Sequence, residues 1–381
     1  MARQAPCRCC RHDEFDHRST DRTATTLPKW ASFMTAPARD VLPCGPDRPV
    51  WVVAELSGNH NGDLGRAKAL LEAAHAAGAD AVKLQTYTAD TITMDAPGPW
   101  FAISEGPWAG RRLFDLYQEA STPWAWHEEL FALAGSLGLI CFSTPFDPTS
   151  VDFLEDLGCP FYKVASFEVV DLPLQQRIAA TGKPVIMSTG MASLAEIDRA
   201  VRTLREGGTP ALALLNCVSA YPAPPEAMHL GDIPRLAAAF SCPVGLSDHT
   251  LDDTAAIAAV ALGACMVEKH LTLRRTDGGP DAGFSLEPEE FARLVRAIRA
   301  TEAAVRPSPS FGPGQADAGN IVFRKSLFVA CDLPAGHVIT ADDVRCIRPG
   351  HGLPPADLGN LLGRTTRTTV ARGTPWRWDL T

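Results

Sequence analysis

The sequence predicts an α/β fold, a (β/α)8 TIM barrel, followed by a small second domain. The chain has 381 residues, of which 46% are hydrophobic and 21% charged, and this apolar content is enough for a large core. From Trp51 onward, short β-rich runs alternate with longer amphipathic segments. Strands that alternate with helices form parallel sheets, and eight such repeats are the number that closes a barrel.

Eight strand candidates follow one another along the chain, each rich in β-branched or aromatic residues and bounded by turn residues. They are WVVAE (51–55), DAVKLQ (80–85), LICFST (139–144), FYKVAS (161–166), PVIMS (184–188), ALALLN (211–216), PVGLS (243–247) and CMVEKH (265–270). Between them, segments such as LAEIDRAVRTLREGG place apolar residues at i, i+3, i+4 and i+7 and end at glycine. A doubly wound open sheet is the alternative, but ELSGNHNG after the first strand is not its GxGxxG fingerprint.

Composition along the chain predicts four parts. Residues 1–48 lack apolar periodicity and a signal-peptide core, and we expect them to be a disordered extension. Residues 49–304 form the catalytic barrel, and residues 305–319, rich in Pro, Gly and Ser, form a linker. Residues 320–381 form a second domain with few residues to bury, which we expect to dock on the barrel or on a partner subunit.

The N-terminal extension contains side chains that could bind zinc. The paired CxxC spacing of most zinc sites is absent, so an unstructured tail is the favoured interpretation, with Met34 as an alternative initiator. The side chains concerned are Cys7, Cys9, Cys10, His12 and His17.

Charge and cysteine content exclude several classes of protein. Thirty-five Lys and Arg against 44 Asp and Glu give a net charge of -9, so no global positive field attracts nucleic acid or an anionic membrane. No apolar run approaches the roughly 20 residues that span a bilayer. The 11 cysteines are odd in number and, beyond the extension, scattered through apolar runs, which indicates free thiols and a cytoplasmic setting.

Polar residues stand at or near the end of every predicted strand. In a barrel the carboxyl ends of successive strands, about 4.8 Å apart, converge on the face where the chemistry takes place. Any one such residue is more often a helix cap or a solvated group, but polar residues at all eight ends together indicate an active site. They are Glu55, Lys83, Gln85, Thr144, Lys163, Ser166, Ser188, Ser219, Tyr221, Ser247, Asp248, His249, Glu268, Lys269 and His270.

Two histidines and one carboxylate are expected to meet where the barrel closes. The strands that end near His249 and His270 become neighbours of the first strand, which ends at Glu55. Two imidazoles and a carboxylate suit Mn²⁺ or another borderline divalent ion. The alternative is that each histidine is a hydrogen-bonded core residue, but both stand in polar strand-end motifs, SDHT and EKH.

Lysines and hydroxyl groups lie on the opposite side of the predicted barrel. Lys83 and Lys163 interrupt strands that are otherwise apolar, and a buried lysine needs an anionic partner or a lowered pKa. Together with hydroxyl groups they suit a phosphate or carboxylate ligand. The hydroxyl groups are those of Ser166, Ser188, Ser219 and Ser247.

A series of motifs in fixed order resembles the sialic acid synthase family of phosphoenolpyruvate-dependent condensing enzymes. The resemblance covers about residues 51–381, and LQTYTADT, GRRLFDLYQEASTPWAWH, FRKSLFV and RPGHGLPP look most like pseudaminic acid synthases within that family. The motifs that carry the family resemblance are AELSGNHNGDLGRA, VKLQTYTADT, FSTPFD, YKVASFE, GKPVIMSTGM, CVSAYPAPPE, VGLSDHT, EKHLTL, GPDAGFSLEP and IRPGHGLPP.

The resemblance implies that phosphoenolpyruvate is joined to the open-chain aldehyde of an acylated amino sugar, here 2,4-diacetamido-2,4,6-trideoxy-L-altrose, with release of phosphate. It implies a divalent metal, Mn²⁺ first and Mg²⁺ or Co²⁺ as alternatives, bound by His249 and His270, with Glu55 beside the metal and the sugar C1. The positions that match phosphoenolpyruvate binding are Lys83, Thr144, Lys163, Ser166, Ser188, Ser219 and Ser247. Those that match positions near the sugar are Gln85, Glu168, Tyr221 and Asp281.

The resemblance also implies a small antifreeze-like SAF domain at the C-terminus. In the family an arginine that matches Arg348 enters the barrel mouth of the other subunit, so a homodimer with swapped C-terminal domains is expected. Two departures from the family pattern, CVS for CTS and EKHLT for EKHFT, remove no side chain assigned to chemistry, although Val218 removes a hydroxyl beside the phosphate.

Three alternatives remain open at the level of the sequence. An N-acetylneuraminate or legionaminate synthase would share the motifs but take another sugar. A class I aldolase would use Lys163 or Lys83 as a Schiff base. A non-catalytic ice- or polysaccharide-binding protein would have a vestigial barrel, which would give no physical reason to keep two lysines and two histidines in apolar strands.

Overall fold

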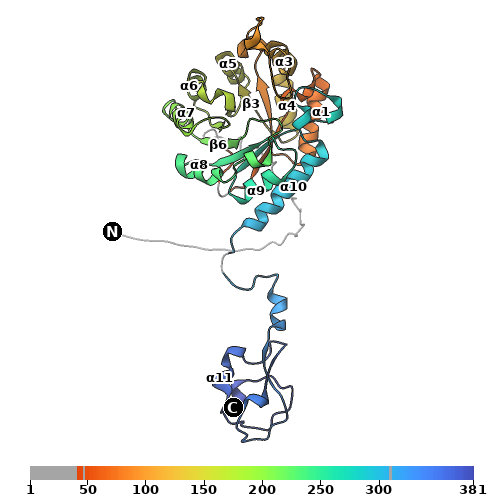
Figure 1. The fold of residues 1–381 in the computed structure, drawn as a ribbon, viewed down its shortest axis with the longest axis vertical. Helices are drawn as coiled ribbons and strands as arrows, with labels where there is room; N and C mark the ends of the chain where they lie inside the picture. Colours follow the sequence, from red (N-terminus) through yellow and green to blue (C-terminus); the bar gives the residue numbers. More distant parts are fainter. Residues whose placement is uncertain (1–40, 46–47, 309–310) are drawn as a thin grey trace, which may run out of the picture. The chain divides into compact units, whose positions relative to one another are not determined.

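The computed structural model describes residues 41–45, 48–308 and 311–381. These residues belong to two compact units, one ending at Arg306 and the other comprising Pro307–Thr381 (Figure 1). Residues 1–40 lie outside the described part of the chain, and with them the possible zinc ligands and Met34.

The first unit is a closed barrel of eight parallel strands in sequential order, so the predicted fold class is confirmed. Every predicted strand is present, and seven of the eight begin one residue later than expected. The barrel closes between the first and last strands, where Glu55 lies opposite His270. The strands are β1 (Trp51–Glu55), β2 (Ala81–Thr86), β3 (Ile140–Pro145), β4 (Tyr162–Val164), β5 (Val185–Ser188), β6 (Leu212–Cys217), β7 (Val244–Asp248) and β8 (Met266–His270).

Helices surround the barrel, as Figure 1 shows. Their ends follow local capping chemistry: Asp63 accepts a hydrogen bond from the backbone N–H of Arg66, and Gly78 ends the same helix with a positive φ of 86°. The helices of this unit are α1 (Leu64–Ala77), α2 (Ala89–Ile92), α3 (Leu113–Ala120), α4 (His127–Ser136), α5 (Pro148–Asp156), α6 (Leu172–Ala179), α7 (Leu194–Glu206), α8 (Asp232–Phe240), α9 (Thr254–Ala261) and α10 (Pro288–Val305). In the described ranges no helix combines the length and apolarity of a bilayer span.

The described end of the predicted extension is part of the core. Leu42 and Cys44 are buried in the same apolar cluster as Trp51 and Phe142. The expectation of disorder up to residue 48 was therefore wrong for these residues, because they cover apolar surface of the barrel.

The second unit has a small core of its own. It contains the antiparallel strands β9 (Ser326–Val329) and β10 (Val344–Ile347) and the short helix α11 (Leu358–Leu361). Trp376 is fully buried at its centre. The other core residues are Leu327, Val329, Leu333, Ile339, Leu361 and Val370.

A buried ion pair fixes the ends of β7 and β8. Lys269 is 0% exposed, and its ammonium group donates to Asp248 Oδ2 (2.7 Å) and to the carbonyls of Thr250 (2.7 Å) and Asp252 (2.9 Å). Asp248 also accepts from the backbone N–H of Thr250 (2.9 Å). These bonds hold the loop that begins at His249.

We expect Lys269→Met to lower the free energy of unfolding by about 3–5 kcal/mol, because it leaves the carboxylate of Asp248 buried without a counter-charge. Urea unfolding at pH 7 measures this loss, and adding Asp248→Asn should recover part of it. Arg235→Met is the control: the Arg235–Asp232 pair has side chains 81% and 44% exposed, so its loss should cost less than about 0.5 kcal/mol. Equal losses in Lys269→Met and Arg235→Met would contradict the structural role of the buried pair.

Candidate active site

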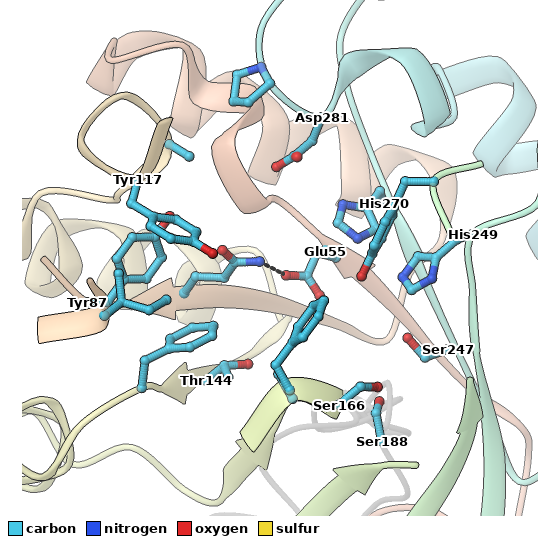
Figure 2. Close-up of a pocket in the computed structure, with 18 of the residues that line it drawn as sticks. Glu55, Tyr87, Tyr117, Thr144, Ser166, Ser188, Ser247, His249, His270 and Asp281 are labelled. Carbon is cyan, nitrogen blue, oxygen red and sulfur yellow. Dashed lines mark hydrogen bonds between the residues drawn. The ribbon is translucent and has the colours of Figure 1, made fainter. Parts of the chain in front are cut away.

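A cavity of about 610 Å³ opens at the carboxyl ends of the strands. It brings together most of the residues singled out from the sequence, and Figure 2 shows ten of its lining residues labelled. The predicted residues that line it are Glu55, Lys83, Gln85, Thr144, Lys163, Ser166, Glu168, Ser188, Tyr221, Ser247, His249, His270 and Asp281.

Two predicted site residues are not part of this lining. The hydroxyl of Ser219 lies beside Gly190, where an added Cβ would come within 2.6 Å of it. Arg348 belongs to the second unit, immediately after β10.

Four buried charges form the floor of the cavity. Lys83 is ion-paired with Glu55 and, at 2.8 Å, with Glu268. Lys163 lies 3.3 Å from the same Oε1 atom of Glu268. Gln85 donates to the other oxygen of Glu55 (2.7 Å), and Ser247 donates to Glu268 (3.1 Å). Two ammonium groups and two carboxylates thus balance one another inside the barrel. We call these four residues the charged floor.

Burial shifts the pKa values of the charged floor in different directions. Burial would lower the pKa of Lys83, but Glu268 and Glu55 outweigh it and raise that pKa. Burial lowers the pKa of Lys163, which has a single carboxylate partner. Burial raises the pKa of Glu55, against the attraction of Lys83. The pKa of Glu268 is lowered, because Lys163 and Lys83 together overcome the effect of burial. Glu55 is therefore the carboxylate more ready to accept a proton.

Hydroxyl groups without partners lie next to the charged floor. Among the described residues, the hydroxyls of Ser188 and Ser219 are buried without a hydrogen-bond partner. Ser166 accepts a hydrogen bond from the backbone N–H of Gly190 (3.2 Å). Gly190 is required here, because an added Cβ would lie 2.6 Å from Ser219 Oγ and 2.8 Å from Ser166 Oγ. Buried hydroxyls without partners are costly, which indicates that a ligand satisfies them.

The two histidines lie on the side of the cavity where the barrel closes, with ring centroids 5.4 Å apart. Nδ1 of His249 donates to the carbonyl of Val218 (2.8 Å). Nδ1 of His270 is 3.1 Å from the hydroxyl of Ser57. Glu55 lines the same cavity and lies opposite His270, and its carboxylate is bound to Lys83 and Gln85.

Carboxylates near the expected sugar position are protonated more easily than usual. Burial raises the pKa of Glu168 to about 7, and its Oε2 atom has no hydrogen-bond partner within the described part of the chain. Burial also raises the pKa of Asp281, which accepts from the backbone N–H of Gly58 (3.0 Å). Both carboxyl groups can therefore donate or accept hydrogen bonds with a polar ligand.

The structure adds residues that the sequence analysis did not assign to the site. Glu268 was noted at a strand end but given no role, although strand alternation places it on the same face as His270, two residues on. Cys217, one of the cysteines that lie in apolar runs, also lines the cavity. Burial alone would raise the pKa of its thiol, but the hydrogen bond and charge of His249, with Ser166 and Lys163, together lower it to about 7.

Comparison with known proteins assigns both units to families. Residues 70–308 match the model of the NeuB family, and residues 324–380 match the SAF domain. The chain is 40% identical to the pseudaminic acid synthase of Helicobacter pylori over 87% of its own length and 98% of the relative's length. It is 35% identical to the N,N'-diacetyllegionaminic acid synthase of Legionella pneumophila, over 89% and 96% of the two chains.

Among solved structures, the chain resembles the N-acetylneuraminic acid synthetase of Leptospira borgpetersenii, crystallised with citrate. The TM-score is 0.64 at 30% identity, over 72% of this chain and 90% of the other. The family resemblance expected from the motifs is therefore confirmed.

The charged floor predicts different effects for its two lysines. Lys83→Met leaves Glu55 without its ion-pair partner and should lower the free energy of unfolding by about 3–5 kcal/mol. Lys163→Met leaves Glu268 bonded to Lys83 and should change the free energy by no more than about 1 kcal/mol. Urea unfolding of both variants at pH 7 measures the difference. Similar losses of unfolding free energy in the two variants would contradict the arrangement in which Lys83 binds both carboxylates and Lys163 binds Glu268 alone.

Proposed function

The chain belongs to the NeuB family, and we propose that it is a pseudaminic acid synthase. It condenses phosphoenolpyruvate with the open-chain aldehyde of 2,4-diacetamido-2,4,6-trideoxy-L-altrose and releases phosphate. The observation that carries this proposal is the 40% identity to the Helicobacter pylori enzyme over almost the whole of both chains. The relative from Legionella pneumophila, at 35% identity, makes a legionaminate synthase the second candidate.

The lysines and hydroxyls of the cavity suit phosphoenolpyruvate, which carries a phosphate and a carboxylate. Lys83 and Lys163 can donate charge-assisted hydrogen bonds to these anions. Ser166 and Ser188 line the cavity, and the hydroxyl of Ser188 has no partner in the described residues. Ser219, whose hydroxyl also has none there, lies beside Gly190, as Ser166 does. An anion bound here would also raise the pKa of Lys163 and keep it protonated.

The condensation needs one new carbon–carbon bond and one proton acceptor. C3 of phosphoenolpyruvate bonds to the aldehyde carbon, whose oxygen becomes a hydroxyl, and water adds to C2. Glu55, with its pKa raised by burial, accepts the proton of that water. This proton balances the one that the aldehyde oxygen takes up. The bond between C2 and the phosphate oxygen then breaks as the C2 hydroxyl becomes the keto group; its proton leaves with the phosphate, whose charge Lys83 and Lys163 balance.

His249 and His270 suit a divalent metal as two nitrogen ligands. The Nδ1–H of His249 is held by a carbonyl, the arrangement found in most metal-bound histidines. The described residues contain no group of three or more His, Cys, Asp or Glu side chains that could hold a metal, so water or substrate oxygens would complete the coordination. When bound, the ion supplies Lewis-acid polarisation of the aldehyde oxygen. Mn²⁺ suits these donors, with Mg²⁺ and Co²⁺ as alternatives.

The assembly is a homodimer in which the second unit of each chain contributes Arg348 to the other barrel. Apolar residues exposed in the loops after β4, β5 and β7 support a docking surface at the barrel mouth. They are Phe167, Val170, Met191, Leu194 and Leu251. The eight cysteines in the described residues are all free, which supports a cytoplasmic location.

Phosphate release from phosphoenolpyruvate should require an acylated amino sugar, with the 2,4-diacetamido-trideoxy sugar of altrose configuration preferred over its manno isomer and over N-acetylmannosamine. With ¹⁸O in the bridging C2–O position, the label should appear in the released phosphate, because the C–O bond breaks. Mass spectrometry of both products decides this. A preference for the manno isomer would favour the legionaminate synthase instead, and label in the keto acid would exclude the proposed chemistry.

Turnover should be lost in excess chelator and restored by Mn²⁺, because His249 and His270 hold the ion that polarises the aldehyde. His270→Ala should bind Mn²⁺ at least 10-fold more weakly in metal-titration calorimetry. Full activity in chelator, or a borohydride-reducible adduct on Lys163, would favour the class I aldolase, for which the lowered pKa of Lys163 is the supporting feature.

Mixed dimers should test the shared site. Arg348→Ala and His270→Ala should each be inactive alone, and their mixture should regain activity as subunits exchange, because one barrel in each mixed pair receives both intact residues. Exchange is followed with differently tagged chains. A monomer by light scattering, or exchange without recovered turnover, would count against the swapped arrangement.

A further inference from the structure

One segment of the chain supplies a largely apolar part of the cavity lining. Residues 87–121 lie between β2 and α4 and contain α2 and α3. They contribute nine residues to the lining, of which Glu105 is the one carboxylate and the other eight, Trp108 and Ala120 among them, are aliphatic or aromatic. The remaining six are Tyr87, Ile92, Ile103, Leu113, Leu116 and Tyr117. We call these six residues the apolar wall. It contrasts with the charged floor, where each side chain is an ammonium group or a carboxylate.

The segment that carries the apolar wall is held in place. The backbone N–H of Ile103 donates to the carbonyl of Arg111 (2.9 Å), and the N–H of Gly110 donates to the carbonyl of Ile103 (2.8 Å). Trp108 donates from Nε1 to the carbonyl of Pro280 (2.7 Å), and its ring lies 5.6 Å from that of Tyr221. The segment is therefore tied to the loop after β8.

The position of the reacting groups decides which part of the sugar faces this wall. Figure 2 shows Tyr87 and Tyr117 across the cavity from His249 and His270, with Glu55 between them. The aldehyde carbon must lie near Glu55 and the histidines to react. The part of the sugar remote from the aldehyde then extends toward the apolar wall.

We propose that the apolar wall binds the C6 methyl group and an acetamido methyl group of the sugar, and so selects 6-deoxy, di-N-acylated sugars over their hydroxylated analogues. This inference rests on the proposed function. A methyl group gains free energy by leaving water for an apolar surface, whereas a hydroxyl placed there loses hydrogen bonds to water. Tyr87 and Tyr117 carry the hydroxyls of the wall and can bond to the acetamide oxygen.

The expected preference for the 6-deoxy sugar is limited by how strongly an apolar pocket can discriminate against a hydroxyl group. Such pockets discriminate against one added hydroxyl by about 100-fold at most. We therefore expect the wild-type chain to prefer the 6-deoxy sugar over the same sugar with a 6-hydroxyl group by about 10- to 100-fold in kcat/KM.

The experiment compares 2,4-diacetamido-2,4,6-trideoxy-L-altrose with its 6-hydroxy analogue, a pair that differs by one oxygen atom. Ile103→Thr and Leu113→Asn each place a polar group in the wall and should reduce the preference about 10-fold, mainly through KM for the deoxy sugar. KM for phosphoenolpyruvate should stay unchanged, because the charged floor is intact. Met94→Thr is the matched control, since Met94 belongs to the same segment but is 63% exposed and does not line the cavity.

Calorimetric titration of the same two sugars into the full chain separates this inference from the proposed function. If the wild-type chain turns over neither sugar, the proposed function fails. The role of the apolar wall is still supported in that case if the wild-type chain binds the deoxy sugar more tightly than its 6-hydroxy analogue and the wall variants do not. If the wild-type chain shows no preference in binding or turnover, the inference is overturned even if no variant folds. Equal losses for both sugars in the wall variants would overturn it as well, because a general structural defect would explain them.

Discussion

The active site depends on the mutual neutralisation of four charges in the interior of the barrel. Lys83 on β2 bonds to Glu55 on β1 and Glu268 on β8, and Lys163 on β4 reaches the same Glu268. An unpaired charge at this depth would cost several kcal/mol, so each of these side chains is tolerated only because it has a partner of opposite charge. The charged floor therefore links strands from opposite sides of the barrel and prepares the cavity for an anionic substrate.

The strand ends and one connecting segment contribute different kinds of side chain to the site. The strand ends supply the charged floor, the hydroxyls and the histidines, and a closed barrel holds them with little freedom to move. The segment 87–121 supplies the apolar wall and is a connection between strand and helix, where a change of sequence leaves the barrel intact. Reaction type would thus be set by the strands, and choice of sugar by a connecting segment, as expected for enzymes that share a fold and differ in substrate.

Much of the site could be predicted because parallel strands bring their carboxyl ends to one face. Thirteen residues to which the sequence analysis gave a role at the site line one cavity, among them Lys163 and His249, which are far apart in the sequence. The pairing of the charges could not be predicted. Glu55 lines the same cavity as the histidines, but its bonds to Lys83 and Gln85 depend on rotamers and neighbours that a single sequence does not reveal.

The sequence by itself determined the eight strands, the helices between them and the faces that carry polar residues, because these follow from local periodicity and turn residues. Only the tertiary structure decided contacts between distant residues. Closure of the barrel placed Glu268 between Lys83 and Lys163. Packing buried Leu42 and Cys44 in the core. A hydrogen bond from Trp108 to Pro280 joined the segment of the apolar wall to the loop after β8. Such contacts depend on the positions of whole elements in space, which no local pattern in the chain specifies.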